Sequence, residues 1–245
     1  MLPGLVTWIV LWIALMFVEI KLLKILFTKG FDINKINFGW LLHPFALSML
    51  SVTGAGIAAL AQNKDIADTA FFMLLISTSM GLFLLSVKLI AVFKSHFIAD
   101  GLPDKQFLPS FLIVIPNITL FAITFFRIGH YLEHQYEAHL HTYFMIIMTA
   151  ALAFETWYMM FGLFLLHDYF KKHFRSEFHV SQWGLVCPFV AYSVLSTFVY
   201  NVFVQNIFFL ILPLAVLAIT VVLFFTLLYK QNIFRKNKEV GISCS

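Results

Sequence analysis

The sequence predicts an all-α integral membrane protein with seven transmembrane helices, and its composition and two features of its apolar runs support this prediction. Hydrophobic residues make up 61% of the 245 residues and charged residues only 11%. A soluble domain usually has about half its residues apolar and about 25% charged. The apolar residues gather in seven runs of the ~20 residues that a membrane-spanning helix needs. These runs do not alternate with polar residues, as the strands of a membrane β-barrel would.

This composition excludes several classes of protein. With so few charged residues, the chain could not cover the surface of a soluble enzyme or a nucleic-acid-binding domain, and it is too apolar for a disordered protein. We therefore expect no enzyme activity, no cofactor and no nucleic-acid partner. The two cysteines, Cys187 and Cys244, form no disulfide framework.

The seven predicted spans follow one another along the chain and leave one short tail. They are Gly4–Leu26, Gly39–Gln62, Thr69–Phe93, Phe107–Phe126, Thr142–Leu166, Gln182–Asn201 and Asn206–Tyr229. We expect residues 1–230 to form a single transmembrane domain and residues 231–245 to form a basic cytoplasmic tail. Trp8 and Trp12 lie near a predicted membrane interface, where aromatic residues are common.

The positions of the basic residues predict the orientation of the helices. Of the 16 Lys and Arg residues, 14 lie around the ends of the first, third, fifth and seventh spans, and only Lys64 and Arg127 lie on the other side. Basic residues gather on the cytoplasmic side of membrane proteins. We therefore expect the N-terminus outside and the C-terminus in the cytoplasm, in a bacterial inner membrane.

An internal repeat divides the last six spans into three helical hairpins. Pro44, Pro116 and Pro188 are each separated by 72 residues, and an aromatic residue stands four or five positions before each proline. Proline removes a backbone hydrogen bond and kinks a helix. In a membrane the freed carbonyl is tolerated where protein, Ser, Thr or water satisfies it, so we expect these helices to face inward. The alternative is a packing kink with no solute nearby.

The residues around the three prolines resemble a known family. The segment Phe178-His-Val-Ser-Gln-Trp-Gly-Leu-Val-Cys-Pro-Phe-Val-Ala-Tyr, together with His43-Pro44-Phe45-Ala46 and Ile115-Pro116, is similar to the last three repeats of the tellurite-resistance/dicarboxylate transporter family. That family contains the plant slow-type anion channels and the malate and sulfite transporters. The resemblance implies ten helices in five hairpins, inner helices around a central pore, and assembly as a trimer.

The resemblance also implies that this chain supplies only the last seven of those helices, with its first span as the return helix of an incomplete hairpin. The pore would be lined by the three prolines and the residues directly before them, which are His43, Ile115 and Cys187. In the family a Phe plugs the pore directly before the break of the last inner helix. Cys187 stands at that position here.

Polar residues within the spans are further candidates for function. Glu155 lies near the middle of the fifth span, where a carboxyl group is either a proton site or a structural residue between helices. His43 either attracts anions or exchanges protons in the pore, since histidine titrates near neutral pH, or it donates to the carbonyl freed by Pro44.

A histidine-rich stretch between the fourth and fifth spans is dense in metal-ligand types. If it is helical, His130, Glu133, His134 and Glu137 share one face, and His130 and His134 are the candidate metal ligands. A hydrated loop at the outer edge of the membrane is the alternative.

The function that we expect is transport of small anions, such as dicarboxylate or sulfite, along the proline-bearing helices. The alternative is a non-transporting membrane subunit or scaffold that binds metal or haem through its histidines. The expected partners are small anions, the lipid bilayer, and either copies of the chain in a homo-oligomer or another chain that supplies the missing helices.

Overall fold

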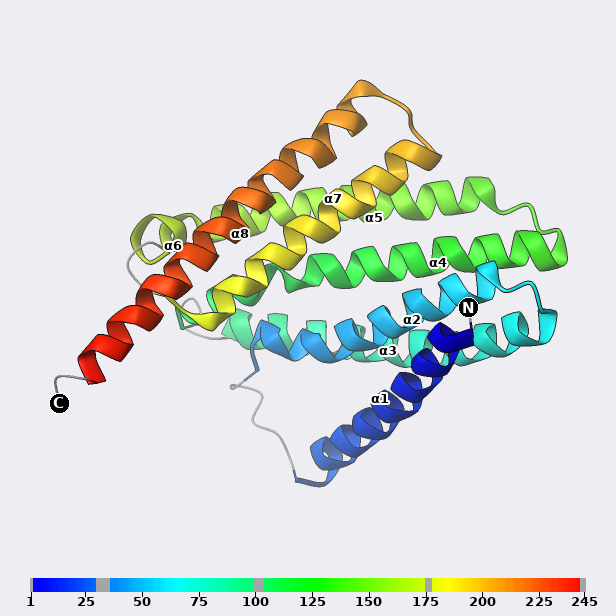
Figure 1. Cartoon of the computed structure of the whole chain (residues 1–245), viewed down its shortest axis with the longest axis horizontal. Helices are drawn as coiled ribbons and strands as arrows, with labels where there is room; N and C mark the ends of the chain where they lie inside the picture. The colour runs from blue at the N-terminus through cyan, green and yellow to red at the C-terminus, as the bar shows by residue number, and fades with distance from the viewer. Residues whose placement is uncertain (1, 30–35, 99–103, 175–177, 243–245) are drawn as a thin grey trace. The chain divides into compact units, whose positions relative to one another are not determined.

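The computed structural model describes residues 2–29, 36–98, 104–174 and 178–242, and every regular element in these ranges is helical. The α-helices are α1 (Leu2–Lys29), α2 (Leu42–Leu60), α3 (Lys64–Ile98), α4 (Val114–Tyr136), α5 (His141–Leu165), α6 (His167–Lys172), α7 (Val186–Val202) and α8 (Ile207–Ile242) (Figure 1). The 3₁₀ segments are η2 (Phe38–Leu41), η3 (Leu108–Ile113) and η4 (Val180–Leu185). Cys244 and the end of the predicted tail lie outside the described residues, as do Lys35 and Arg175 from the count of basic residues.

Six helical segments of the described chain are long and apolar enough to cross a membrane. They are 38–60, 64–98, 108–136, 141–165, 180–202 and 207–234, and they correspond to the second to seventh predicted spans. The first predicted span lies in α1, which has 28 residues but is not one of these six. The second half of α1 carries Glu19, Lys21 and Lys24. The prediction of an all-α, multi-pass membrane protein is therefore confirmed.

The chain forms two compact units. The first unit comprises residues 1–101 and 117–151, and the second unit comprises residues 102–116 and 152–245. The helices of the three predicted hairpins are present as α2 and α3, α4 and α5, and α7 and α8.

Each repeated proline marks a change of helix type. Pro44, Pro116 and Pro188 are each the third residue of their α-helix, and a 3₁₀ segment ends directly before each of these helices. In a 3₁₀-helix an N–H bonds the carbonyl three residues back, and in an α-helix the carbonyl four residues back. Proline has no N–H and can make neither bond, so it occupies the junction between the two patterns. The sequence alone suggested a kink within each span and not this junction.

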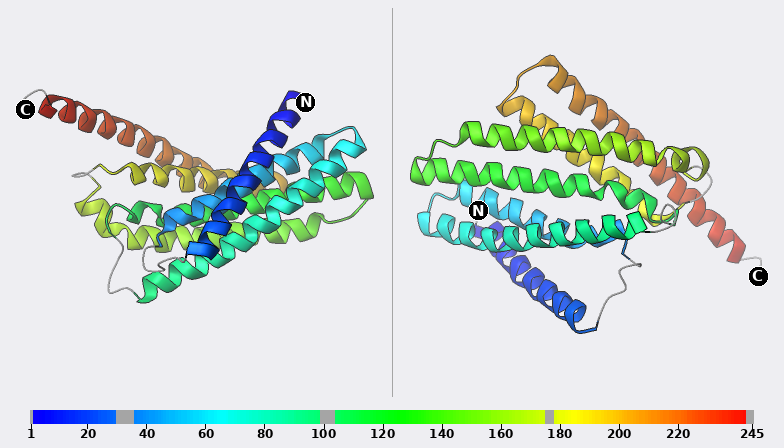
Figure 2. Two further views of the ribbon diagram at one scale, coloured as in Figure 1. Left: turned by 90° about the horizontal axis from the view of Figure 1, so that it is seen from below. Right: turned by 180° about the vertical axis from the view of Figure 1, so that it is seen from behind.

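In the first unit, two tryptophans attach α1 to the hairpin of α2 and α3, which lie side by side (Figure 2). The indole N–H of Trp8 donates to the carbonyl of Leu50 at 2.9 Å, and that of Trp12 donates to the carbonyl of Met73 at 3.0 Å. Trp8 reaches α2 because Gly54 has no side chain there: a Cβ at Gly54 would lie 2.4 Å from the Trp8 ring. Small residues permit close helix packing in membranes, where the hydrophobic effect does not drive association.

In the second unit, hydroxyl groups connect the spans. The Tyr192 hydroxyl of α7 lies 2.8 Å from that of Thr156 in α5. The Thr156 hydroxyl donates to its own helix at Leu152, so Tyr192 is the donor between the two. The Ser193 hydroxyl donates to the carbonyl of Pro213 in α8 at 3.3 Å. Such bonds between helices contribute on average about 0.6 kcal/mol each.

Candidate functional site

At the first proline junction, side chains from other helices satisfy the carbonyls that proline leaves free. An N–H at residue 44 would bond Trp40 in an α-helix or Leu41 in a 3₁₀-helix. The Trp40 carbonyl accepts a hydrogen bond from Nζ of Lys88 in α3 at 3.2 Å, and the Leu41 carbonyl accepts one from Nδ2 of Asn117 in α4 at 3.4 Å. This arrangement meets the expectation that neighbouring protein groups satisfy the break.

In the other two hairpins the return helix also donates hydrogen bonds near the junction, but to atoms other than the carbonyls that Pro116 and Pro188 leave free. In the second hairpin, the Tyr158 hydroxyl of α5 donates to the carbonyl of Phe111 in η3 at 3.1 Å. In the third, Nζ of Lys230 in α8 donates to Oε1 of Gln182 in η4 at 3.1 Å and also to the carbonyl of Phe174. The donors stand at corresponding positions of the repeat: Tyr158 and Lys230 each follow their proline by 42 residues, and Lys88 follows its proline by 44. Sequence reasoning counted the two lysines only as markers of the cytoplasmic side.

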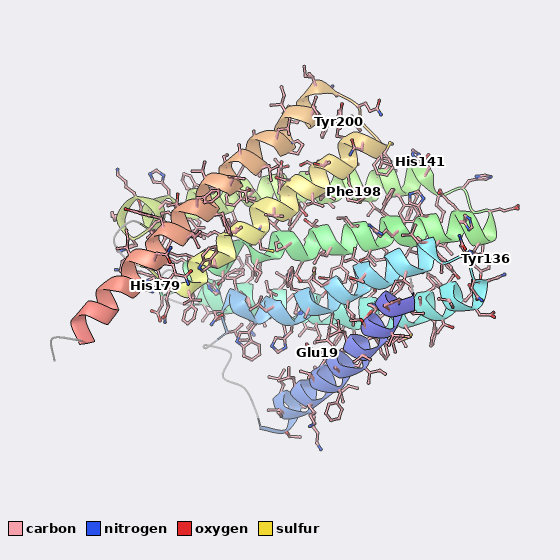
Figure 3. All side chains as sticks on the ribbon, in the orientation of Figure 1. Glu19, Tyr136, His141, His179, Phe198 and Tyr200 are labelled. Carbon is pink, nitrogen blue, oxygen red and sulfur yellow. The ribbon has the colours of Figure 1, made fainter. Side chains whose placement is uncertain are left out.

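His43 does not donate to the freed carbonyls. Its Nδ1 atom lies 3.6 Å from Oε2 of Glu19 in α1, and its ring stacks on that of Trp40 with 6.5 Å between the centroids. The His43 side chain is 33% exposed, whereas that of Glu19 is almost fully buried. Figure 3 labels Glu19 on α1. Sequence reasoning missed Glu19, although an acidic residue inside a predicted span was a sufficient signal.

The other two residues that directly precede a repeated proline differ in exposure. Ile115 is fully buried, whereas Cys187 is exposed. Both belong to the second unit, and His43 belongs to the first. Glu155 is fully buried in α5.

The histidine-rich stretch does not form one continuous helix. The α4 helix ends at Tyr136, and Glu137 has a φ of 54°, which is a left-handed conformation common after the end of a helix. Glu137 therefore does not share a helical face with His130, whose Nδ1 lies 3.9 Å from Oε2 of Glu133. No group of three or more metal-ligating side chains occurs in the part of the chain that the structure describes.

A pocket in the first unit contains a basic residue that sequence reasoning treated only as a charge on the outer side. The pocket has a volume of about 490 Å³. It is lined by Gly4, Leu5, Val52, Thr53, Gly56, Ile57, Leu60 and Arg127. Nε of Arg127 is buried without a hydrogen-bond partner, and no ion pair joins Arg127 to a carboxylate of the described residues.

The guanidinium reaches α2 through a gap at Gly56. A Cβ at Gly56 would lie 2.7 Å from Nη1 of Arg127, so any side chain at this position would displace the guanidinium. Thr53 is the other polar side chain that lines the pocket. It carries no charge, and its hydroxyl donates to the carbonyl of Met49 at 2.9 Å. The pocket therefore combines one uncompensated cation with mostly apolar walls.

Comparison with known proteins identifies the family. The family model described as voltage-dependent anion channel (SLAC1) matches residues 3–231, which include all seven predicted spans. Searches of curated proteins and of solved structures found no match. The match covers the three proline junctions and the helices that return from them. The chain therefore belongs to the voltage-dependent anion channel family, the tellurite-resistance/dicarboxylate transporter family that its proline repeats resemble.

Proposed function

We propose that the chain moves small anions, such as dicarboxylate or sulfite, across the membrane, and that the proline-bearing helices α2, α4 and α7 line the path. The family match supports anion transport in general. The burial of the helices supports the choice of lining helices. The most buried segment is that of α4, at 78%, and the least buried is that of α8, at 11%.

The observation that carries the proposal is an exposed stripe on α7, a helix whose segment is half buried. Cys187, Val190, Val194 and Thr197 are the exposed residues of the first three turns of α7, and their spacing of three or four residues places them on one helical face. The stripe begins directly before Pro188. A path for a solute along α7 requires such a continuous face.

The proline-bearing helix of the first hairpin repeats part of this pattern. His43 and Thr53 stand in α2 where Cys187 and Thr197 stand in α7, and Thr53 is also exposed. Both threonine hydroxyls donate to the carbonyl four residues back, so each presents its oxygen and methyl group without a free donor. Attraction of an anion must then come from other groups, such as cationic side chains, because the first backbone N–H of each of the three α-helices already donates to the preceding 3₁₀ segment.

A flux measurement on variants of Cys187 tests the proposal. If Cys187 lines the path, Cys187→Phe reduces anion flux in liposomes because the phenyl ring fills the path, and Cys187→Ala changes flux little. Val222→Phe is the matched control, since Val222 is a 68% exposed residue of the least buried helix, α8. Flux is expressed per folded protein, and thermal stability is measured on the same samples.

The alternative is that Cys187 lies on an exposed face of α7 that has no part in a path. In that case Cys187→Phe leaves both thermal stability and flux per folded protein at the level of the unchanged chain, because an exposed position has room for the ring. That result would remove Cys187 from the path. Equal loss of flux in the Val222→Phe control would show that added bulk acts through the membrane and not through a path.

A further inference from the structure

We propose that the Arg127 pocket of the first unit is a binding site for an organic monocarboxylate. The lining of the pocket includes none of His43, Ile115 and Cys187, and binding there does not require transport. Its basis is the unpaired guanidinium, the volume of the pocket and the chemistry of the pocket walls.

The positive charge of Arg127 lies on α4, next to the pocket. Arg127 stands nine residues before the end of α4, which places it about 13 Å inside the helix end at 1.5 Å per residue. Arg127 directly follows the predicted span Phe107–Phe126, and a charge at the edge of a span normally pairs with an opposite charge or faces water. Arg127 has no carboxylate partner among the described residues and borders an open pocket. The open pocket therefore gives an anion from outside the unit access to the guanidinium.

The guanidinium and the walls of the pocket select the kind of anion. A planar guanidinium offers two parallel N–H donors, which match the two oxygens of a carboxylate. Arg127 is the only charged residue among those that line the pocket, so the walls provide a partner for one negative charge and not for two. Leu5, Ile57 and Leu60 provide apolar surface, which favours an anion with a short hydrocarbon part over chloride or sulfate.

Gly56 gives the Arg127 guanidinium room beside α2. The guanidinium lies where a Cβ of residue 56 would be, at 2.7 Å, and α2 carries a glycine at that point. The neighbouring residue Ala55 is fully buried and has a Cβ, so α2 does not require glycine throughout this turn. Gly56 therefore keeps the space that Arg127 occupies in the pocket.

Direct binding to the purified full chain in detergent tests the proposal, with butyrate, succinate and chloride as probes in isothermal titration calorimetry. Butyrate should bind, and succinate and chloride should bind more weakly. Arg127→Gln should weaken butyrate binding at least about tenfold, because it removes charge-assisted hydrogen bonds. Arg127→Lys should weaken butyrate binding less, because lysine keeps the positive charge but lacks the two parallel N–H donors of the guanidinium. Gly56→Ala should weaken it by displacing the guanidinium.

The control is Lys64→Gln, which removes the other basic residue of the predicted outer side and leaves the pocket intact. Lys64 lies over the ring of Tyr136 and does not line the pocket. Unchanged binding in this variant and weaker binding in the three pocket variants supports the site. Equal butyrate binding by Arg127→Gln and the unchanged chain overturns it, as does tighter binding of chloride or succinate. If Arg127→Gln does not fold, butyrate binding by Arg127→Lys and Gly56→Ala tests the site, and binding equal to that of the unchanged chain in both variants overturns it.

Two further results separate this proposal from its rivals. If added phosphatidylglycerol competes with butyrate and binds more tightly, the pocket holds a lipid phosphate and the monocarboxylate assignment is wrong. A chain that transports dicarboxylate in liposomes but binds no butyrate refutes this site alone. A chain that binds butyrate but transports no anion refutes the proposed function alone.

Discussion

Removal of a single hydroxyl, in Tyr158→Phe, tests whether the return helices hold the proline junctions. The Tyr158 side chain is almost fully buried, and its hydroxyl donates to the carbonyl of Phe111 in η3 at 3.1 Å. The ring itself stacks on that of Phe111 with 5.0 Å between the centroids. The variant keeps this stack and leaves no large cavity, so the change isolates the hydrogen bond.

The expected loss of stability follows from the membrane setting. Side-chain hydrogen bonds between transmembrane helices contribute about 0.6 kcal/mol on average and at most about 1.7 kcal/mol. The bond of Tyr158 is buried, and its acceptor lies in η3, the segment that ends directly before the α-helix with Pro116. We therefore expect Tyr158→Phe to lose about 1–1.7 kcal/mol and also to lower anion flux, because η3 is held less firmly.

The matched control is Tyr192→Phe, which removes the donor to Thr156 at 2.8 Å between the middle parts of two helices. It should lose a similar free energy of unfolding, measured by titration with SDS in mixed micelles, but its flux per folded protein should remain unchanged. If Tyr158→Phe equals the unchanged chain in both stability and flux, the hydroxyl does not support the junction. If both variants lower flux equally, the effect is not specific to the junction.

Two other predictions concern packing and orientation. Gly54→Ala should destabilise the first unit by about 1–3 kcal/mol, because the new Cβ would lie 2.4 Å from the Trp8 ring, whereas Gly184→Ala, with nothing within 4 Å, should stay within about 0.5 kcal/mol of the unchanged chain. Both are measured by the same SDS titration, and equal effects would contradict the packing argument. In a chain without native cysteines, a cysteine at position 64 should react with an impermeant reagent in intact cells and one at position 172 should not; labelling of position 172 would reverse the predicted orientation.

The helical type and six of the seven spans could be predicted from the sequence because the relevant signal is long and local. A bilayer demands about 20 apolar residues for each helix, and six of the seven predicted spans meet that requirement in the structure. The 72-residue spacing of Pro44, Pro116 and Pro188 also indicated the hairpins correctly. The change from 3₁₀ to α could not be predicted, because both helix types have the same hydropathy and tolerate proline near their starts.

The side-chain contacts of the site depended on neighbours that no local pattern reveals. From the sequence, Trp8 is expected at the membrane interface because it lies near the end of a predicted span. In the structure Trp8 is only 3% exposed, and its indole N–H donates a hydrogen bond to α2. Gly54 makes this possible, and glycine in a transmembrane helix is a general signal of close approach that does not name the partner. Glu19 was a readable signal, since the rule for intramembrane charge that selected Glu155 applies to it equally.

The buried basic residues change the argument for orientation and strengthen it. The positive-inside rule concerns Lys and Arg residues that remain near the membrane surface. Lys88 and Lys230 are 7% and 9% exposed and donate hydrogen bonds to the chain around the proline junctions. Without them, the 14 basic residues counted on the cytoplasmic side become 12. Of the two basic residues on the outer side, Arg127 lines a pocket, so only Lys64 is counted there. A ratio of 14 to 2 thus becomes 12 to 1, and the predicted orientation does not depend on the cations that the fold uses for other purposes.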